Sequence, residues 1–134
     1  MIELSESVTK EMNKYLDGIT IEEILLLKRK LFHFQVNFTE EQMNQEIDVL
    51  DLSVRAYHCL RRADMHTIGK LVNSTFTKED ATSKRQLLKI RNLGRNSADE
   101  ILIKLFNYQF MVLPDNKKKA YMDNLLKINF ATSK

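Results

Sequence analysis

A chain of 134 residues with 43% hydrophobic and 29% charged residues has the composition of one globular domain with additions. Three glycines and one proline leave few positions for turns and so favour an all-α fold. The net charge of +3 is accompanied by a single cysteine, Cys59, which excludes an internal disulfide and a CxxC motif. The longest uninterrupted apolar run, Ile24 to Leu27, is too short to span a membrane, and we expect a cytoplasmic protein.

Three helices are predicted in the acidic N-terminal segment. The first covers residues 5–16, where apolar residues recur at helical spacing. A Thr-x-x-Glu capping box at Thr20 begins the second, which is expected to run to about His33. A Thr-x-x-Gln box at Thr39 predicts a short third helix over residues 40–46. The residue types indicate no chemistry, and they leave open whether this extension is a packing appendage or a docking and dimerisation surface.

The charge distribution changes after this segment. Residues 1–46 carry five Lys/Arg against nine Asp/Glu, which gives −4. Residues 47–110 carry eleven against seven, which gives +4, and residues 111–134 carry five against two, which gives +3. The middle segment could therefore bind a polyanion or could simply be a solvated surface.

The next predicted helix begins at Ser53, a favourable N-cap residue. Val54, Tyr57 and Leu60 follow at helical spacing, so we expect Arg55 to point away from this apolar line. A single exposed arginine is usually a solvated charge. Near a helix N-terminus that faces a glycine turn, however, an arginine can enter a narrow minor groove.

Residues 87–106 are predicted to form two helices joined by a tight glycine hairpin. The core-facing residues of the second helix recur at helical spacing: Ala98, Ile101, Leu102, Leu105 and Phe106. Ser97 and Glu100 have the spacing of a capping box at its start. Gly94 is expected to supply the turn, where a positive φ and the close approach of a nucleic-acid backbone are possible.

A last helix is predicted after the break at residues 113–116, with a face composed of Ala120, Tyr121, Leu125 and Ile128. The three lysines at residues 117–119 are unfavourably placed for the helix dipole. They could be solvated or could contact a phosphate group.

Two separated motifs carry a resemblance to a known family. The run from Ile47 to Val72 contains Leu-Ser-Val-Arg and Cys-Leu and resembles the C-terminal domain of the bacterial RNA polymerase alpha subunit. The segment Leu-Leu-Lys-Ile-Arg-Asn-Leu-Gly-Arg-Asn-Ser at residues 87–97, followed by Glu100, resembles the helix-hairpin-helix of the same family. The resemblance covers about residues 47–108, and two motifs in the correct order are more specific than a lone glycine turn.

The resemblance implies an all-α fold of about five short helices with a helix-hairpin-helix core over residues 47–110. Relative to the family, residues 74–83 form a polar insertion, in which Phe76 could be an anchor. Residues 1–46 would then be an acidic helical extension, and residues 111–134 a C-terminal helical tail.

The resemblance also implies a DNA-binding site in which Arg55 is the principal contact, inserted in the minor groove. Glu100 would help to orient this arginine. His58 stands where the family usually has asparagine, and Asn96 where it usually has lysine, a loss for which Arg95 and Arg91 could partly compensate. The implied DNA-binding residues are Arg55, His58, Cys59, Asn92, Gly94, Arg95, Asn96, Ser97 and Glu100.

The sequence contains no recognisable catalytic set, and the three histidines lack the spacing of a zinc site, so we predict neither an enzyme nor a cofactor or metal. We predict a DNA-binding transcription module that contacts the minor groove of A·T-rich promoter-upstream DNA. Its further partners would be transcription regulators or RNA polymerase subunits. One alternative is an interaction module that binds polymerase, sigma factor or a regulator without DNA. Another, a generic helix-hairpin-helix repair module, is disfavoured by Leu-Ser-Val-Arg.

Overall fold

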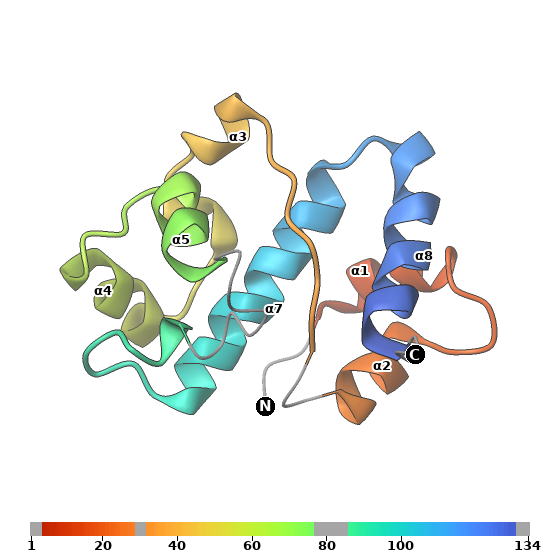
Figure 1. Ribbon diagram of the computed structural model, residues 1–134, viewed down its shortest axis with the longest axis horizontal. Helices are drawn as coiled ribbons and strands as arrows, with labels where there is room; N and C mark the ends of the chain where they lie inside the picture. The colour runs from red at the N-terminus through yellow and green to blue at the C-terminus, as the bar shows by residue number, and fades with distance from the viewer. Residues whose placement is uncertain (1–3, 29–31, 77–85, 131–134) are drawn as a thin grey trace.

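The computed structural model describes residues 4–28, 32–76 and 86–130, and the regular elements within these ranges are helices (Figure 1). Their elements are α1 (Glu6–Asn13), α2 (Ile21–Leu27), α3 (Glu40–Met43), the 3-10 helix η1 (Ile47–Leu50), α4 (Val54–Arg62), α5 (Ile68–Thr75), α7 (Arg95–Val112) and α8 (Asp115–Phe130). The predicted all-α class is confirmed. No described helix combines the length and apolar character needed to cross a bilayer.

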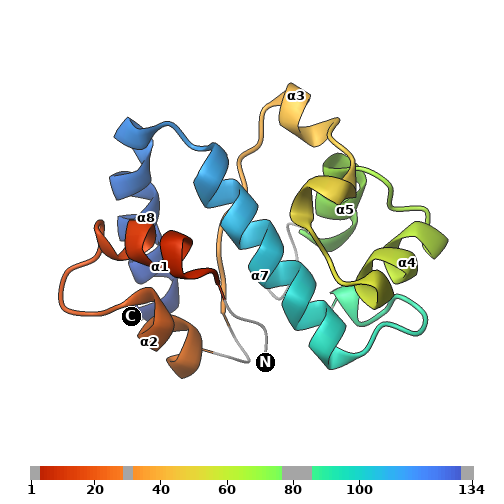
Figure 2. The same cartoon turned by 180° about the vertical axis from the view of Figure 1, so that it is seen from behind.

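Helix α7 lies between two groups of helices. In Figures 1 and 2, α3, η1, α4 and α5 lie on one side of α7, and α1, α2 and α8 lie on the other. Both α4 and η1 contact α7. The predicted core face of α7 is confirmed, because the following side chains are all buried: Ala98, Ile101, Leu102, Leu105 and Phe106. The helix continues beyond the predicted end at residue 106, and this extra length joins the two sides.

The predicted capping boxes of α2 and α3 are both formed. The Glu23 N–H donates to Thr20 Oγ1 at 3.2 Å, and the Thr20 N–H donates to Glu23 Oε1 at 2.9 Å. Thr39 and Gln42 exchange the same pair of bonds at 3.1 and 2.9 Å. These reciprocal bonds satisfy amides that a helix N-terminus would otherwise leave free.

The predicted ends of α2 and α3 are wrong. Helix α2 stops at Leu27 instead of continuing to His33, and α3 stops at Met43 instead of Glu46. Residues 32–39 are not helical. Every second side chain of this segment packs against the core: Phe32, Phe34, Val36 and Phe38. A two-residue period is that of an extended backbone, and it prevails here over the apparent helical pattern.

Side chains of α7 and α8 hold this extended segment by its backbone: Gln109, Tyr121 and Asn129. Asn129 accepts from the His33 N–H at 3.0 Å and donates to the His33 carbonyl at 2.8 Å. The Tyr121 hydroxyl donates to the Gln35 carbonyl at 2.8 Å, and burial raises the pKa of this hydroxyl. The segment therefore has side-chain partners in place of a neighbouring strand.

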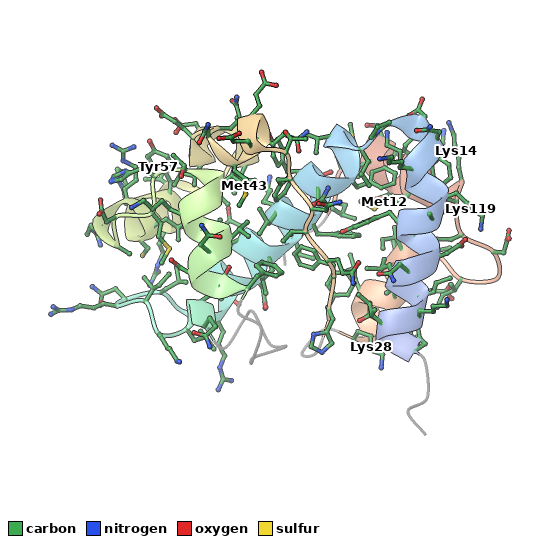
Figure 3. All side chains as sticks on the ribbon, turned by 45° about the horizontal axis from the view of Figure 1, so that its top comes forward. Met12, Lys14, Lys28, Met43, Tyr57 and Lys119 are labelled. Carbon is green, nitrogen blue, oxygen red and sulfur yellow. The ribbon has the colours of Figure 1, made fainter. Side chains whose placement is uncertain are left out.

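Helix α3 packs on α5 at Gly69. A Cβ at this position would lie 3.1 Å from the backbone carbonyl oxygen of Met43, which is tighter than an ordinary contact. Glycine thus permits the close approach of the two helices. As a result, α3, although it belongs to the predicted N-terminal extension, lies against the helices that follow it (Figure 3).

The predicted C-terminal helix is confirmed, and its predicted face is correct at Tyr121 and Leu125 but wrong at Ala120 and Ile128. The buried residues of α8 are Lys118, Met122, Leu125 and Asn129, whereas Ala120 and Ile128 are exposed. Lys118 is buried, and its Nζ lies 5.0 Å from the centre of the Phe110 ring and 3.1 Å from Asp115 Oδ1. Lys119 Nζ lies 2.8 Å from Asp123 Oδ1. Both ammonium groups therefore already have carboxylate partners.

Aromatic and cationic contacts join the ends of distant segments. The Phe76 ring lies 5.4 Å from that of Phe34, so Phe76 anchors the start of the predicted insertion. Residues 77–85 of that insertion lie outside the described ranges. Lys28, at the end of α2, lies 5.0 Å from the centre of the Phe130 ring at the end of α8 (Figure 3).

Candidate nucleic-acid interface

Helix α4 begins at the predicted cap. The Ala56 N–H donates to Ser53 Oγ at 3.3 Å, and Arg55 is exposed in the first turn, as expected. The predicted apolar line is wrong at Val54, whose side chain is 73% exposed. The buried residues are Ala56, Cys59 and Leu60. This face is the one that the contact between α4 and α7 requires.

The predicted cap of α7 is wrong. Gly94 is the N-cap residue and provides no side-chain bond, whereas Ser97 lies inside the first turn and is only 8% exposed. Gly94 has a φ of −84°, and the left-handed residue of the hairpin is Asn92, with a φ of 67°. Asparagine tolerates this conformation better than most residues with a side chain. A Cβ at Gly94 would meet nothing within 4 Å, so this position faces open space.

Glu100 connects α7 to the start of α4. Its carboxylate accepts hydrogen bonds from the Ser53 N–H and from the Ser53 hydroxyl, the latter at 2.7 Å, and the residue is only 6% exposed. Any effect of Glu100 on Arg55 thus passes through Ser53. The two bonded residues are 47 positions apart, and no local sequence signal indicates their contact.

Cys59 connects α4 to the hairpin. It is 4% exposed, and its Sγ lies 3.5 Å from the backbone oxygen of Asn92. The thiol therefore contacts the hairpin backbone and is not presented to solvent. Because the hairpin is fixed in this way at Asn92, its position relative to α4 is defined.

Five of the nine predicted site residues gather around one surface depression of about 360 Å³: Arg55, Gly94, Arg95, Asn96 and Ser97. No carboxylate in the described ranges forms an ion pair with Arg55 or Arg95. The first turn of α7 also leaves amide groups uncapped by a side chain. An exposed guanidinium beside a free helix N-terminus is suited to binding an anion.

The other four predicted residues are not among those that line the depression. Asn92, Cys59 and Glu100 fix the hairpin and the start of α4. His58 is exposed and packs edge-on against Tyr57, with ring centres 5.6 Å apart. Among the described residues, no group of three His, Cys, Asp or Glu side chains could hold a metal ion.

The structure defines a class of protein. It is an all-α domain in which an arginine-bearing helix packs against a hairpin and the following helix. The family model for the C-terminal domain of the bacterial RNA polymerase alpha subunit matches residues 35–107, more than half of the sequence. The protein belongs to this family. It therefore has a transcription-related role, in a family that is a non-catalytic part of the polymerase.

Three relatives illustrate the similarity, and each is named DNA-directed RNA polymerase subunit alpha. The protein of Cyanophora paradoxa is 42% identical over 80 residues, which cover 59% of this chain and 23% of the relative. That of Oceanobacillus iheyensis is 42% identical over 66 residues (49% and 18%), and that of Mesostigma viride 41% over 80 residues (59% and 23%). The matched region thus spans about a fifth of the length of these relatives. No solved structure matches significantly.

The family match begins earlier than the predicted domain boundary at residue 47. It includes α3, which packs on α5, and it ends within α7. Helices α1, α2 and α8 lie outside the match. The boundaries at residues 46 and 110 stay predictions.

Proposed function

We propose that this protein is a DNA-binding transcription module whose residues 47–110 grip the minor groove of A·T-rich DNA upstream of promoters. The observation that supports this proposal most directly is the position of Arg55, which shares one depression with the first turn of α7. Arg55 would enter the groove, and the first turn of α7 would contact a phosphate of the adjacent backbone.

Two electrostatic fields would attract a duplex to this surface. A-tract DNA has a narrow minor groove whose negative potential attracts an inserted arginine. The free amides and positive dipole end of a helix N-terminus favour a phosphate. Arg55 is exposed and has no carboxylate partner among the described residues, so its charge is available to a duplex. Ser53 and Glu100 hold the helix that carries it.

The partners proposed for the module are RNA polymerase subunits and transcription regulators. The named relatives are alpha subunits of DNA-directed RNA polymerase, and the family model covers their C-terminal domain. A protein that binds such partners without significant DNA binding is the alternative, and the experiment below distinguishes the two.

Arg55→Ala is expected to lower the affinity for an A-tract duplex by about tenfold or more, because a specific groove contact contributes about 1–3 kcal/mol. The affinity for a G·C duplex should fall less, so the preference between the two sequences should shrink. Fluorescence anisotropy at two salt concentrations measures both effects, with Arg61→Gln as the matched control because Arg61 is exposed on the same helix.

Two results would count against this function. If wild type binds A-tract and G·C duplexes equally, and Arg55→Ala leaves both affinities unchanged, Arg55 does not read the groove. If wild type binds neither duplex, the interaction module without DNA becomes the better account. Circular dichroism of Arg55→Ala confirms that any loss of affinity is not a loss of fold.

A further inference from the structure

Helix α4 carries a second arginine on the same face as Arg55. At ~100° and ~1.5 Å per residue, Arg62 lies about 20° around the helix from Arg55 and about 10 Å further along it. Both side chains are exposed. Arg55 and Arg62 therefore form a row that starts at the depression and runs toward the C-terminal end of α4.

The hairpin brings another arginine toward the same end of α4. Near the helix N-terminus, Arg55 lines the depression with residues 94–97. One turn later, Cys59 contacts the backbone oxygen of Asn92. The hairpin and α4 thus run in opposite directions, and Arg91, which precedes Asn92, is exposed beyond this contact.

Among the described residues, Arg62 and Arg91 differ from their neighbour Arg61 in having no side-chain partner. The Arg61 guanidinium lies 5.6 Å from the centre of the Tyr57 ring, and the Tyr57 hydroxyl is 3.4 Å from Asp48 Oδ2, toward η1. In the described part of the protein, neither Arg62 nor Arg91 forms an ion pair or a hydrogen bond through its side chain. Within the described ranges, the guanidinium groups of Arg62 and Arg91 are therefore without a side-chain partner, whereas that of Arg61 packs on Tyr57.

We propose that Arg62 and Arg91 form a second contact site, for the backbone phosphates of the duplex whose minor groove receives Arg55. This inference rests on the proposed function. The minor groove is about 6 Å wide and is bordered by phosphates on both strands. A separation of about 10 Å along α4 allows Arg62 to reach a backbone while Arg55 lies in the groove. These contacts contribute affinity without sequence preference.

The test compares Arg62→Gln and Arg91→Gln with wild type and with Arg61→Gln as the matched control. Binding to A-tract and G·C duplexes is followed by fluorescence anisotropy over a range of salt concentrations. Each of the first two variants should reduce the slope of log Kobs against log salt by about 0.9, the value for one phosphate. Each should weaken both duplexes by the same factor and so preserve the A-tract preference. Arg61→Gln should keep the wild-type slope.

A wild-type slope in either Arg62→Gln or Arg91→Gln overturns the second contact site. If Arg55→Ala still reduces the A-tract preference in that experiment, the proposed function stands without the second contact site. If wild type fails to bind either duplex, both proposals fall. All three glutamine substitutions lie on exposed positions, and circular dichroism verifies that the helices are retained.

Discussion

Phe106→Ala should lower the free energy of unfolding by about 3–5 kcal/mol, the usual cost of emptying a buried aromatic site. Phe106 is fully buried in α7. Its ring centre lies 5.2 Å from that of Phe32, 5.4 Å from that of Phe34 and 6.3 Å from that of Tyr121. The substitution therefore removes packing between α7, α8 and the extended segment at once.

Phe130→Ala is the matched control, because it deletes the same side chain at a position that is 38% exposed. It should cost less than Phe106→Ala, because more than a third of Phe130 is already exposed to solvent and its removal leaves a smaller cavity. Urea denaturation of both variants provides the comparison. Equal losses would contradict the assignment of Phe106 as the central packing residue.

Glu100→Ala should lower the free energy of unfolding by about 2–3 kcal/mol. The loss has two sources, because the Ser53 N–H is left without its carboxylate acceptor and the Ser53 hydroxyl loses the bond that orients it as the cap of α4. Duplex affinity should fall as well, although Glu100 is buried, because Arg55 follows this cap by two residues.

Glu100→Gln retains an acceptor oxygen of similar shape and should lose less stability and less affinity than Glu100→Ala. A double-mutant cycle with Ser53→Ala, measured by denaturant unfolding, isolates the coupling between the two residues. We expect a coupling of about 1–2 kcal/mol, typical of directly bonded neighbours. Because Ser53→Ala retains the backbone N–H that donates to Glu100, additive effects of the two alanine substitutions would show that the bond from the Ser53 hydroxyl contributes nothing.

The sequence predicted correctly those features that depend on residues close together in the chain. The capping boxes at Thr20 and Thr39 are formed because each bond is made within three residues. The core face of α7 follows from apolar spacing in one long helix. The predicted end of α2 is wrong because a helical and a two-residue apolar period overlap near Phe32. The residues that stabilise the extended form, such as Asn129, are distant in the sequence.

In the candidate site, too, contacts between distant residues were not predicted from the sequence. Five of the nine residues that the family resemblance implied, Arg55 among them, line one depression. The capping box predicted from Ser97 and Glu100 is wrong, because a Ser-x-x-Glu spacing indicates such a box only where no more distant residue binds the carboxylate. Here the Ser53 hydroxyl donates a hydrogen bond to this carboxylate, although the two residues are 47 positions apart in the sequence. Likewise, the positive φ belongs to Asn92, while Gly94 has an ordinary backbone conformation.

The central claim is that the N-terminal part of α4 and the hairpin before α7 form the DNA-binding surface. Amide chemical-shift mapping during titration with an A-tract duplex tests it most directly. We predict the largest shifts at Arg55, at its neighbours in α4 and at residues 91–97, with little change in α1 and α2. Shifts confined to residues 1–46, or no shifts at saturating duplex, would contradict the claim.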